Sequence, residues 1–215
     1  SPQSRYFRFV SSMQELPATM LSRFTLIDYD REMVRIARED TPADLAGKLE
    51  FKEMSAVQLE FPNATFDIVL NRHAPISPIE VTRVLRPGGV CITQQVGTNN
   101  TQNVYEALGW ESNGAYIRAS SGGGSDPSSS GWELASVARE FERCGSEVVR
   151  AETYDVPYYF TDVRSFVFWL KSVPIPMSFD DDANVTAVAE FISAHTTVRG
   201  IKTNEQRDLL VVHKG

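Results

Sequence analysis

The sequence predicts an α/β fold in which a mostly parallel, doubly wound sheet carries helices on both faces. Short β-branched apolar runs alternate with amphipathic stretches along the 215 residues, and this alternation is typical of parallel strands joined by helices. The composition, 42% hydrophobic and 23% charged, is that of a globular protein. No apolar run approaches the ~20 residues that a membrane span needs.

The first half of the chain supplies four expected strands in order. They lie at 24–28, 49–54, 66–70 and 90–96. Asp30 is placed to cap a helix after the first run, and Ser77-Pro-Ile-Glu80 is a capping box with proline at the first helical position. That second helix ends at Arg86-Pro-Gly-Gly89, which turns the chain into the fourth strand.

The second half begins after residues 120–131, a stretch of serine and glycine that predicts a flexible loop. Helices are expected over 132–143, 161–171 and 183–194, and strands over 147–154 and 209–213. A long excursion joins the last two strands, so one of them can run antiparallel to the rest.

The net charge, the N-terminal residues and the cysteines indicate which binding partners and which cellular compartment to expect. A net charge of −7 repels nucleic acid and anionic membranes, so neither is an expected partner. Residues 1–12 contain no signal-peptide core, and we expect a cytoplasmic protein. Cys91 and Cys144 are interpreted as buried free thiols rather than a disulfide or metal ligands. Asp180 to Asp182 is expected to complement a helix dipole rather than to bind metal, so no metal site is predicted.

Candidate functional residues follow the carboxyl ends of the strands, where open α/β sheets bind ligands. This rule selects Asp28, the turn at Ser55 and Ala56, the loop Asn71-Arg72-His73 and the loop after Val96. One carboxylate can accept hydrogen bonds from both hydroxyls of a ribose, which suits Asp28. Asp28 can also simply cap the chain or face water, although Asp30 is already available as a cap.

His73 is the best candidate for acid–base chemistry, because histidine titrates near neutral pH and can take a proton from an acceptor. The alternative is a loop histidine with a local hydrogen bond. His195 and His213 are expected to be structural or to face solvent. Several late aromatic residues can line a substrate pocket or belong to the core or to a dimer surface: Tyr154, Tyr158, Tyr159, Phe160, Phe166 and Trp169.

Three segments resemble class I S-adenosylmethionine-dependent methyltransferases of the small-molecule type. Residues 24–38 resemble the family's second-strand motif, residues 59–73 its fourth-strand motif, and Glu80-Val-Thr-Arg-Val-Leu-Arg-Pro-Gly-Gly-Val90 its turn into strand five. The family's order and spacing are kept. The resemblance implies a Rossmann-like sheet and methyl transfer from S-adenosylmethionine to a small-molecule acceptor.

Carried over by position, the resemblance assigns roles to individual residues. Asp28 would hold the cofactor ribose and Tyr29 would flank the adenine. Ser55 and Ala56 occupy the adenine edge, where most relatives have an acid instead of Ser55. Asn71 and Arg72 would lie under the methionine end, and His73 would face the substrate.

The resemblance also sets the expected organisation of the chain. We expect a single methyltransferase-like domain over 1–215, with an N-terminal helical region at 1–23 and a cofactor-binding core at 24–97. A flexible connection at 98–131 then leads to a C-terminal half at 132–215 with the substrate-side excursion.

The family's glycine-rich first motif has no counterpart here, because residues 11–23 contain no glycine. Either the natural protein carries a glycine-rich segment between residues 11 and 24 that is missing from this sequence, or this is a degenerate methyltransferase that acts by binding a partner. A nicotinamide-dependent oxidoreductase also places an acid after its second strand, but it needs a glycine-rich loop of its own. It does not explain the Arg-Pro-Gly-Gly turn.

Overall fold

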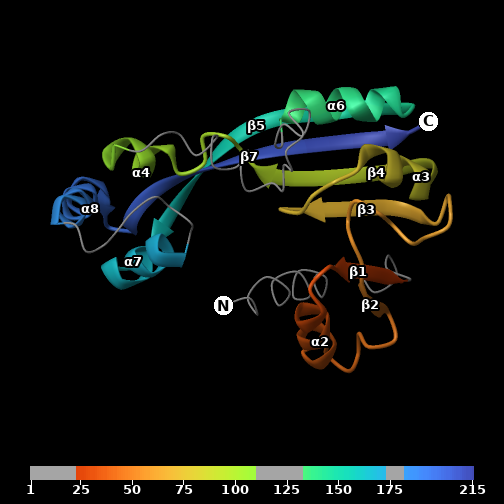
Figure 1. The fold of residues 1–215 in the computed structure, drawn as a ribbon, viewed down its shortest axis with the longest axis horizontal. Helices are drawn as coiled ribbons and strands as arrows, with labels where there is room; N and C mark the ends of the chain where they lie inside the picture. The colour runs from red at the N-terminus through yellow and green to blue at the C-terminus, as the bar shows by residue number, and fades with distance from the viewer. Residues whose placement is uncertain (1–22, 110–132, 173–181) are drawn as a thin grey trace.

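The computed structural model describes residues 23–109, 133–172 and 182–215, and Figure 1 shows their arrangement. In chain order the elements are β1 (Phe24–Asp28), α2 (Arg31–Glu39), β2 (Leu49–Glu53), β3 (Phe66–Arg72), α3 (Pro78–Val84), β4 (Leu85–Val96), α4 (Gln102–Ala107), α6 (Leu134–Arg143), β5 (Ser146–Phe160), α7 (Val163–Ser172), α8 (Asp182–His195), β6 (Thr196–Thr197) and β7 (Gly200–Lys214). The predicted N-terminal helical region and the serine–glycine loop at 120–131 lie outside the described residues, apart from Arg23.

The strands form two sheets. One contains β1 and β2, which are parallel, and the other has the order β3-β4-β7-β5 with β6 beside β7. Strands β3, β4 and β5 run in one direction, and β7 is antiparallel to its neighbours, as the long excursion suggested. In Figure 1 the arrowheads of β1, β3 and β4 point the same way. The predicted α/β fold class with mostly parallel strands is confirmed.

Each sheet has its own apolar core. Helices α3 and α6 cover one face of the larger sheet, where Phe141, Cys91 and Leu210 are fully buried. Helix α2 packs on β1 and β2 through Val34 and Ala37. The carboxylate of Asp30 caps α2 by accepting from the backbone N–H groups of Glu32 and Met33, as predicted.

A third core lies at the far end of the long β5–β7 ribbon. Both strands are 15 residues long, well beyond the predicted 147–154 and 209–213. Their distal halves carry α4, α7 and α8 around Phe166, Leu170 and Phe191. Phe160 and Trp169 pack there too, so three of the six late aromatic residues belong to this core. Figure 1 places these helices beyond the carboxyl ends of β3 and β4.

Three local details refine the sequence-based expectations. Strand β4 already begins at Leu85, so Arg86 to Gly89 lies inside a strand rather than in a separate turn. Both cysteines are free thiols as predicted, but only Cys91 is fully buried, because Cys144 follows the exposed end of α6. None of the helices in the described part of the chain is both long and apolar enough to cross a membrane.

Candidate active site

The end of β1 presents the first predicted site residue. Asp28 is half-buried, and its Oδ1 accepts a hydrogen bond from the backbone N–H of Asp30 at 2.9 Å. A carboxylate has about four acceptor positions, so the type of side chain suits hydrogen bonds to a ligand as well as to the backbone. Tyr29 follows directly and is 82% exposed, so its ring is accessible for stacking.

The end of β2 leads into a loop that carries Ser55 and Ala56. Ser55 is exposed, and its Oγ accepts the backbone N–H of Val57 at 3.4 Å, which leaves the hydroxyl proton available for donation. Ala56 is half-buried. Met54, just before them, donates its backbone N–H to the carbonyl of Asp28 at 2.9 Å, which joins this loop to the end of β1.

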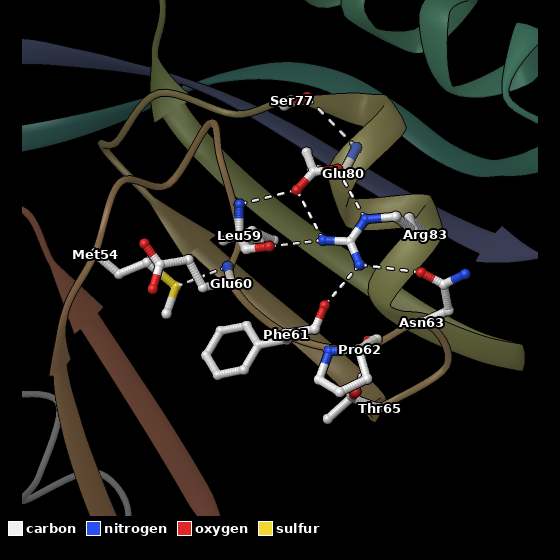
Figure 2. A network of polar contacts seen from close by, with 10 residues as sticks. All are labelled: Met54, Leu59, Glu60, Phe61, Pro62, Asn63, Thr65, Ser77, Glu80 and Arg83. Atoms are coloured by element: carbon white, nitrogen blue, oxygen red, sulfur yellow. Dashed lines mark hydrogen bonds and ion pairs between the residues drawn. The ribbon is translucent and has the colours of Figure 1, made fainter.

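An ion pair on α3 holds the far part of the same loop (Figure 2). Arg83 donates to Glu80 at 2.8 Å, to the carbonyl oxygen of Leu59 at 2.7 Å and to that of Phe61 at 2.6 Å. Glu80 in turn accepts the backbone N–H of Leu59 at 2.9 Å. The Arg83 guanidinium and then the Leu59 N–H lower the pKa of Glu80 to about 2. The pair therefore fixes the loop that follows the predicted adenine-edge residues.

At the end of β3, Asn71 lies on the sheet face that α3 and α6 cover. Its Oδ1 accepts from Thr93 Oγ1 at 3.0 Å and from Gln95 Nε2 at 2.5 Å, and its Nδ2 donates to the carbonyl of Pro75 at 3.0 Å. Gln95 also donates to the carbonyl of Ala74. The Asn71 amide is thus engaged in holding the loop after β3. Its predicted contact with the cofactor stays a prediction.

His73 follows in a left-handed backbone conformation, with φ +51°. Its backbone N–H donates to the carbonyl of Gln94 at 3.0 Å. Residues other than glycine with positive φ are uncommon, and they often occur at functional sites. The imidazole therefore belongs to a loop whose two sides, the Asn71 amide and the Gln94 carbonyl, are both fixed by hydrogen bonds.

Arg72 lies on the opposite sheet face from Asn71, because side chains alternate along a strand. Its Nε donates to Gln94 Oε1 at 3.2 Å, and Gln94 Nε2 donates to the Tyr154 hydroxyl at 2.6 Å. Sequence reasoning gave Gln94 no role of its own at the site. It selected Tyr154 only as one of several candidate aromatic residues.

The side chains at the ends of β1 and β2 fit the nucleoside end of S-adenosylmethionine, the cofactor that the sequence resemblance implies. Asp28 offers a carboxylate for ribose hydroxyls, and Ser55 a hydroxyl for the adenine edge. For the amino-acid end the chain has no glycine before Gly47, and no strand of the described residues pairs with β3 on its side away from β4. Arg72 is the cation that β3 itself places at its carboxyl end.

Other candidates for site chemistry have structural surroundings. The His195 ring stacks on Phe191 with centroids 4.0 Å apart, and its Nδ1 lies 2.9 Å from the Phe191 carbonyl. That agrees with the structural role expected for His195. His213 is an exposed residue of β7. Within residues 23–109, 133–172 and 182–215, no cluster of three or more His, Cys, Asp or Glu side chains has an arrangement that could hold a metal ion.

Comparisons with known proteins agree with the fold. Residues 9–93 match the family model described as a methyltransferase domain. A candidate methyltransferase of Bacillus halodurans C-125 is 14% identical, with 98% of this chain and 99% of that chain covered at a TM-score of 0.58. The YcgJ protein of Bacillus subtilis is 16% identical, with 90% and 82% covered at a TM-score of 0.56.

A functionally unknown protein of Deinococcus radiodurans R1 is 14% identical, with 90% of this chain and 70% of that chain covered at a TM-score of 0.52. No curated protein matches the chain by sequence. At such low identities these structures establish a shared fold, and the family match is a similarity of residues 9–93 to methyltransferase domains.

Proposed function

We propose that this protein transfers a methyl group from S-adenosylmethionine to a small-molecule acceptor. The match of residues 9–93 to a methyltransferase-domain model and the similarity of the fold to that of a candidate methyltransferase support this proposal. The observation that carries the proposal is the position of the candidate residues at the carboxyl ends of strands, where open α/β sheets bind their ligands. Asp28 ends β1, Arg72 ends β3, and His73 follows Arg72 directly.

In this proposal some residues bind the cofactor and one residue, His73, transfers a proton. S-adenosylmethionine supplies a methyl group bound to a positively charged sulfur. Asp28 accepts hydrogen bonds from the ribose, and Ser55 donates to the adenine edge. His73 accepts the proton of the acceptor's nucleophilic atom on a neutral ring nitrogen. Methyl transfer is an in-line displacement that depends mainly on the positioning of the reactants.

The net charge of the protein and two exposed apolar side chains on helix α7 support a small-molecule acceptor. The net charge of −7 disfavours polynucleotide substrates. Figure 1 shows helix α7 beyond the carboxyl ends of β3 and β4. Two apolar side chains of this helix, Val163 and Phe168, are 50% and 68% exposed. We propose that these side chains contact an apolar part of the acceptor.

Titration calorimetry with S-adenosylhomocysteine, the demethylated product, tests the cofactor site. We expect micromolar binding to the mass-verified protein and its loss in Asp28→Ala. Asp67→Asn is the matched control, because Asp67 is an exposed acid near the opposite end of β3. Absence of binding to the unaltered protein would contradict the proposal.

Replacement of His73 tests the proton acceptor. We expect His73→Ala to lower turnover by about 10²- to 10⁴-fold, the usual contribution of a positioned general base. Affinity for S-adenosylhomocysteine is expected to stay unchanged, because no cofactor contact is lost. Turnover is measured with saturating cofactor. Unaltered turnover would remove His73 from the mechanism.

A second candidate function is partner binding by a methyltransferase-like protein without activity. The absence of glycine before Gly47 and the division of the strands into two sheets favour it. The same titration separates the two functions. A protein that binds neither S-adenosylhomocysteine nor S-adenosylmethionine would support partner binding.

A further inference from the structure

Strand β5 continues past the carboxyl end of β4, and one face of this extension carries apolar side chains (Figure 1). Tyr154 and the last residue of β4, Val96, are both paired with Arg207 of β7. Tyr154 therefore lies level with the end of β4, and the later residues of β5 extend beyond it. Because side chains alternate along a strand, Tyr154, Val156 and Tyr158 share one face. We call these three side chains the β5 strip.

The outer part of the β5 strip is exposed, and its aromatic ring is held in place. Val156 and Tyr158 are each 41% exposed, and Tyr154 is half-buried. The Tyr158 ring makes a T-shaped contact with Phe160, with centroids 4.9 Å apart. Phe160 in turn belongs to the core that α7 and α8 form. A ring held by such a contact presents a fixed surface on which a flat molecule can stack.

The inner end of the β5 strip is joined to the loop of His73 through one residue of β4. Gln94 Nε2 donates to the Tyr154 hydroxyl at 2.6 Å, and the Gln94 carbonyl accepts the backbone N–H of His73 at 3.0 Å. A hydroxyl has one proton to donate besides its acceptor positions, and the bond from Gln94 uses an acceptor position. The strip therefore combines a hydroxyl at the end nearest His73 with apolar groups further out.

The charged side chains beside the β5 strip neutralise each other. Arg207 and Glu205 lie opposite Tyr154 and Val156 in the β5–β7 register, so their side chains are on the same face as the strip. They form an ion pair with each other, and Arg207 is buried. These two neighbours thus add no net charge to the face, which favours an uncharged ligand over an ionic one.

We propose that the β5 strip binds the methyl acceptor and that this acceptor is an uncharged planar phenol. The inference rests on the proposed function and names the substrate class of the same site. The aromatic ring of the acceptor stacks on Tyr158 and contacts Val156. Its hydroxyl oxygen accepts a hydrogen bond from Tyr154, which places that oxygen on the side of His73.

A phenol suits a site with one histidine base and one hydroxyl donor. Its pKa is about 10, as for the tyrosine side chain, so it loses its proton far more readily than an aliphatic alcohol. A hydrogen bond from Tyr154 to the oxygen favours the deprotonated form further. His73 takes the hydroxyl proton while the oxygen bonds to the methyl carbon and the bond from that carbon to sulfur breaks. The products are an aryl methyl ether and S-adenosylhomocysteine.

The first test compares two acceptors of the same ring skeleton on the full chain. Naphthol is a planar phenol, and decahydronaphthol is its saturated, non-planar counterpart. Each is incubated with the protein and saturating S-adenosylmethionine, and methyl ether formation is followed by mass spectrometry. We expect naphthol to be methylated and decahydronaphthol to remain unchanged.

Substitutions of two neighbouring tyrosines test the stacking surface. We expect Tyr158→Ala to raise the KM for naphthol by about 10-fold, the size of a lost aromatic contact. Tyr158→Phe should leave the KM unchanged, because the ring remains. Tyr159→Ala is the matched control and should also leave it unchanged. The Tyr159 ring lies on the other face of β5, with its centroid 4.2 Å from the Arg199 guanidinium.

Tyr154→Phe tests the hydroxyl donor. We expect kcat for naphthol to decrease by about 10-fold, the usual contribution of one hydrogen bond. Naphthalenethiol has the same planar shape but is already largely ionised at neutral pH, so its methylation needs no donor. Its kcat should therefore stay unchanged in Tyr154→Phe, whereas a purely structural role of Tyr154 would slow both acceptors equally.

Four outcomes would overturn the inference. If decahydronaphthol is methylated as well as naphthol, the acceptor class is wrong. If Tyr158→Ala and Tyr159→Ala have equal effects on the KM, the strip is not the acceptor site. If the protein binds S-adenosylhomocysteine but does not methylate naphthol, the inference fails and the proposed function stands. If it does not bind S-adenosylhomocysteine, both fail together.

Discussion

At the scale of single residues, the Glu80–Arg83 pair links acid stability to the loop after β2. Arg83 lowers the pKa of Glu80 from 4.5 to about 2. A carboxyl group with a lowered pKa in the folded state stabilises the protein above its unfolded pKa, and this contribution is lost as the pH falls through the folded pKa. The stabilisation that this pair provides should therefore be lost as the pH falls from about 4.5 to about 2.

Glu80→Gln tests this linkage. We expect the variant to unfold more easily at pH 7 and to show a smaller decrease in its free energy of unfolding between pH 4.5 and pH 2. Urea denaturation at several pH values measures it. Asp67→Asn serves as the control, since Asp67 belongs to an ion pair and its side chain is 77% exposed. An unaltered pH dependence in Glu80→Gln would show that the pair does not govern acid stability.

At the scale of elements, two glycines have a positive φ within strands, Gly200 at the start of β7 and Gly88 inside β4. Gly200 opens β7 with φ +115°, and an added Cβ would lie 2.2 Å from the carbonyl oxygen of Phe160. Gly88 in β4 also has a positive φ, +77°, but an added Cβ would meet nothing within 4 Å. A side chain at either position would be strained because of the positive φ. At Gly200 its Cβ would also clash with the backbone of Phe160.

Alanine at each position separates the two effects. Gly88→Ala should cost about 1 to 2 kcal/mol, the price of a left-handed alanine. Gly200→Ala should cost clearly more, because the Phe160 carbonyl belongs to the paired strand and cannot move without breaking the β5–β7 ladder. Chemical denaturation of both variants measures the difference. Equal losses would mean that the ribbon adjusts to the added methyl group.

Elements could be predicted from the sequence where their apolar residues repeat with a clear period. The first strand, 24–28, was predicted at its observed bounds, because a short β-branched run is followed by the capping Asp30. Strand β7 was predicted only at 209–213. Its first half, which includes Asn204 and Gln206, is polar and is held by backbone pairing to β5, so it gives no apolar alternation.

The candidate site could be predicted to a similar extent. The strand-end rule located Asp28, Arg72 and His73 at the carboxyl ends of their strands, as observed. It could not identify Gln94 as the partner of Arg72. The hydrogen bond between Gln94 and Tyr154 joins residues 60 positions apart, and such a contact depends on the order β3-β4-β7-β5, which one sequence does not reveal.

At the scale of the whole molecule, the two sheets should differ in local stability. The core on β1 and β2 is small, and the side chains of β1 are all only half-buried. Strands β4 and β7 share a core with several fully buried side chains. Units with few buried apolar contacts open at lower free energy.

Hydrogen exchange followed by mass spectrometry tests this difference. We expect the amides of β1 and β2 to exchange faster than those of β4 and β7. S-adenosylhomocysteine should slow exchange at β1, because a ligand bound to Asp28 stabilises the closed state. The core of β4 and β7 is the internal control, since its protection should not change. Equal protection of the two sheets without ligand would contradict this expectation.

The outer position of β3 has a consequence for how the protein behaves at high concentration. Within the described residues β3 has a strand neighbour only in β4, and Ile68 and Leu70 on it are 59% and 52% exposed. An apolar strand with unpaired backbone groups is a template on which another chain can add a strand. Samples of this protein should therefore self-associate reversibly as their concentration rises, and a charged residue at position 70 should keep them monomeric.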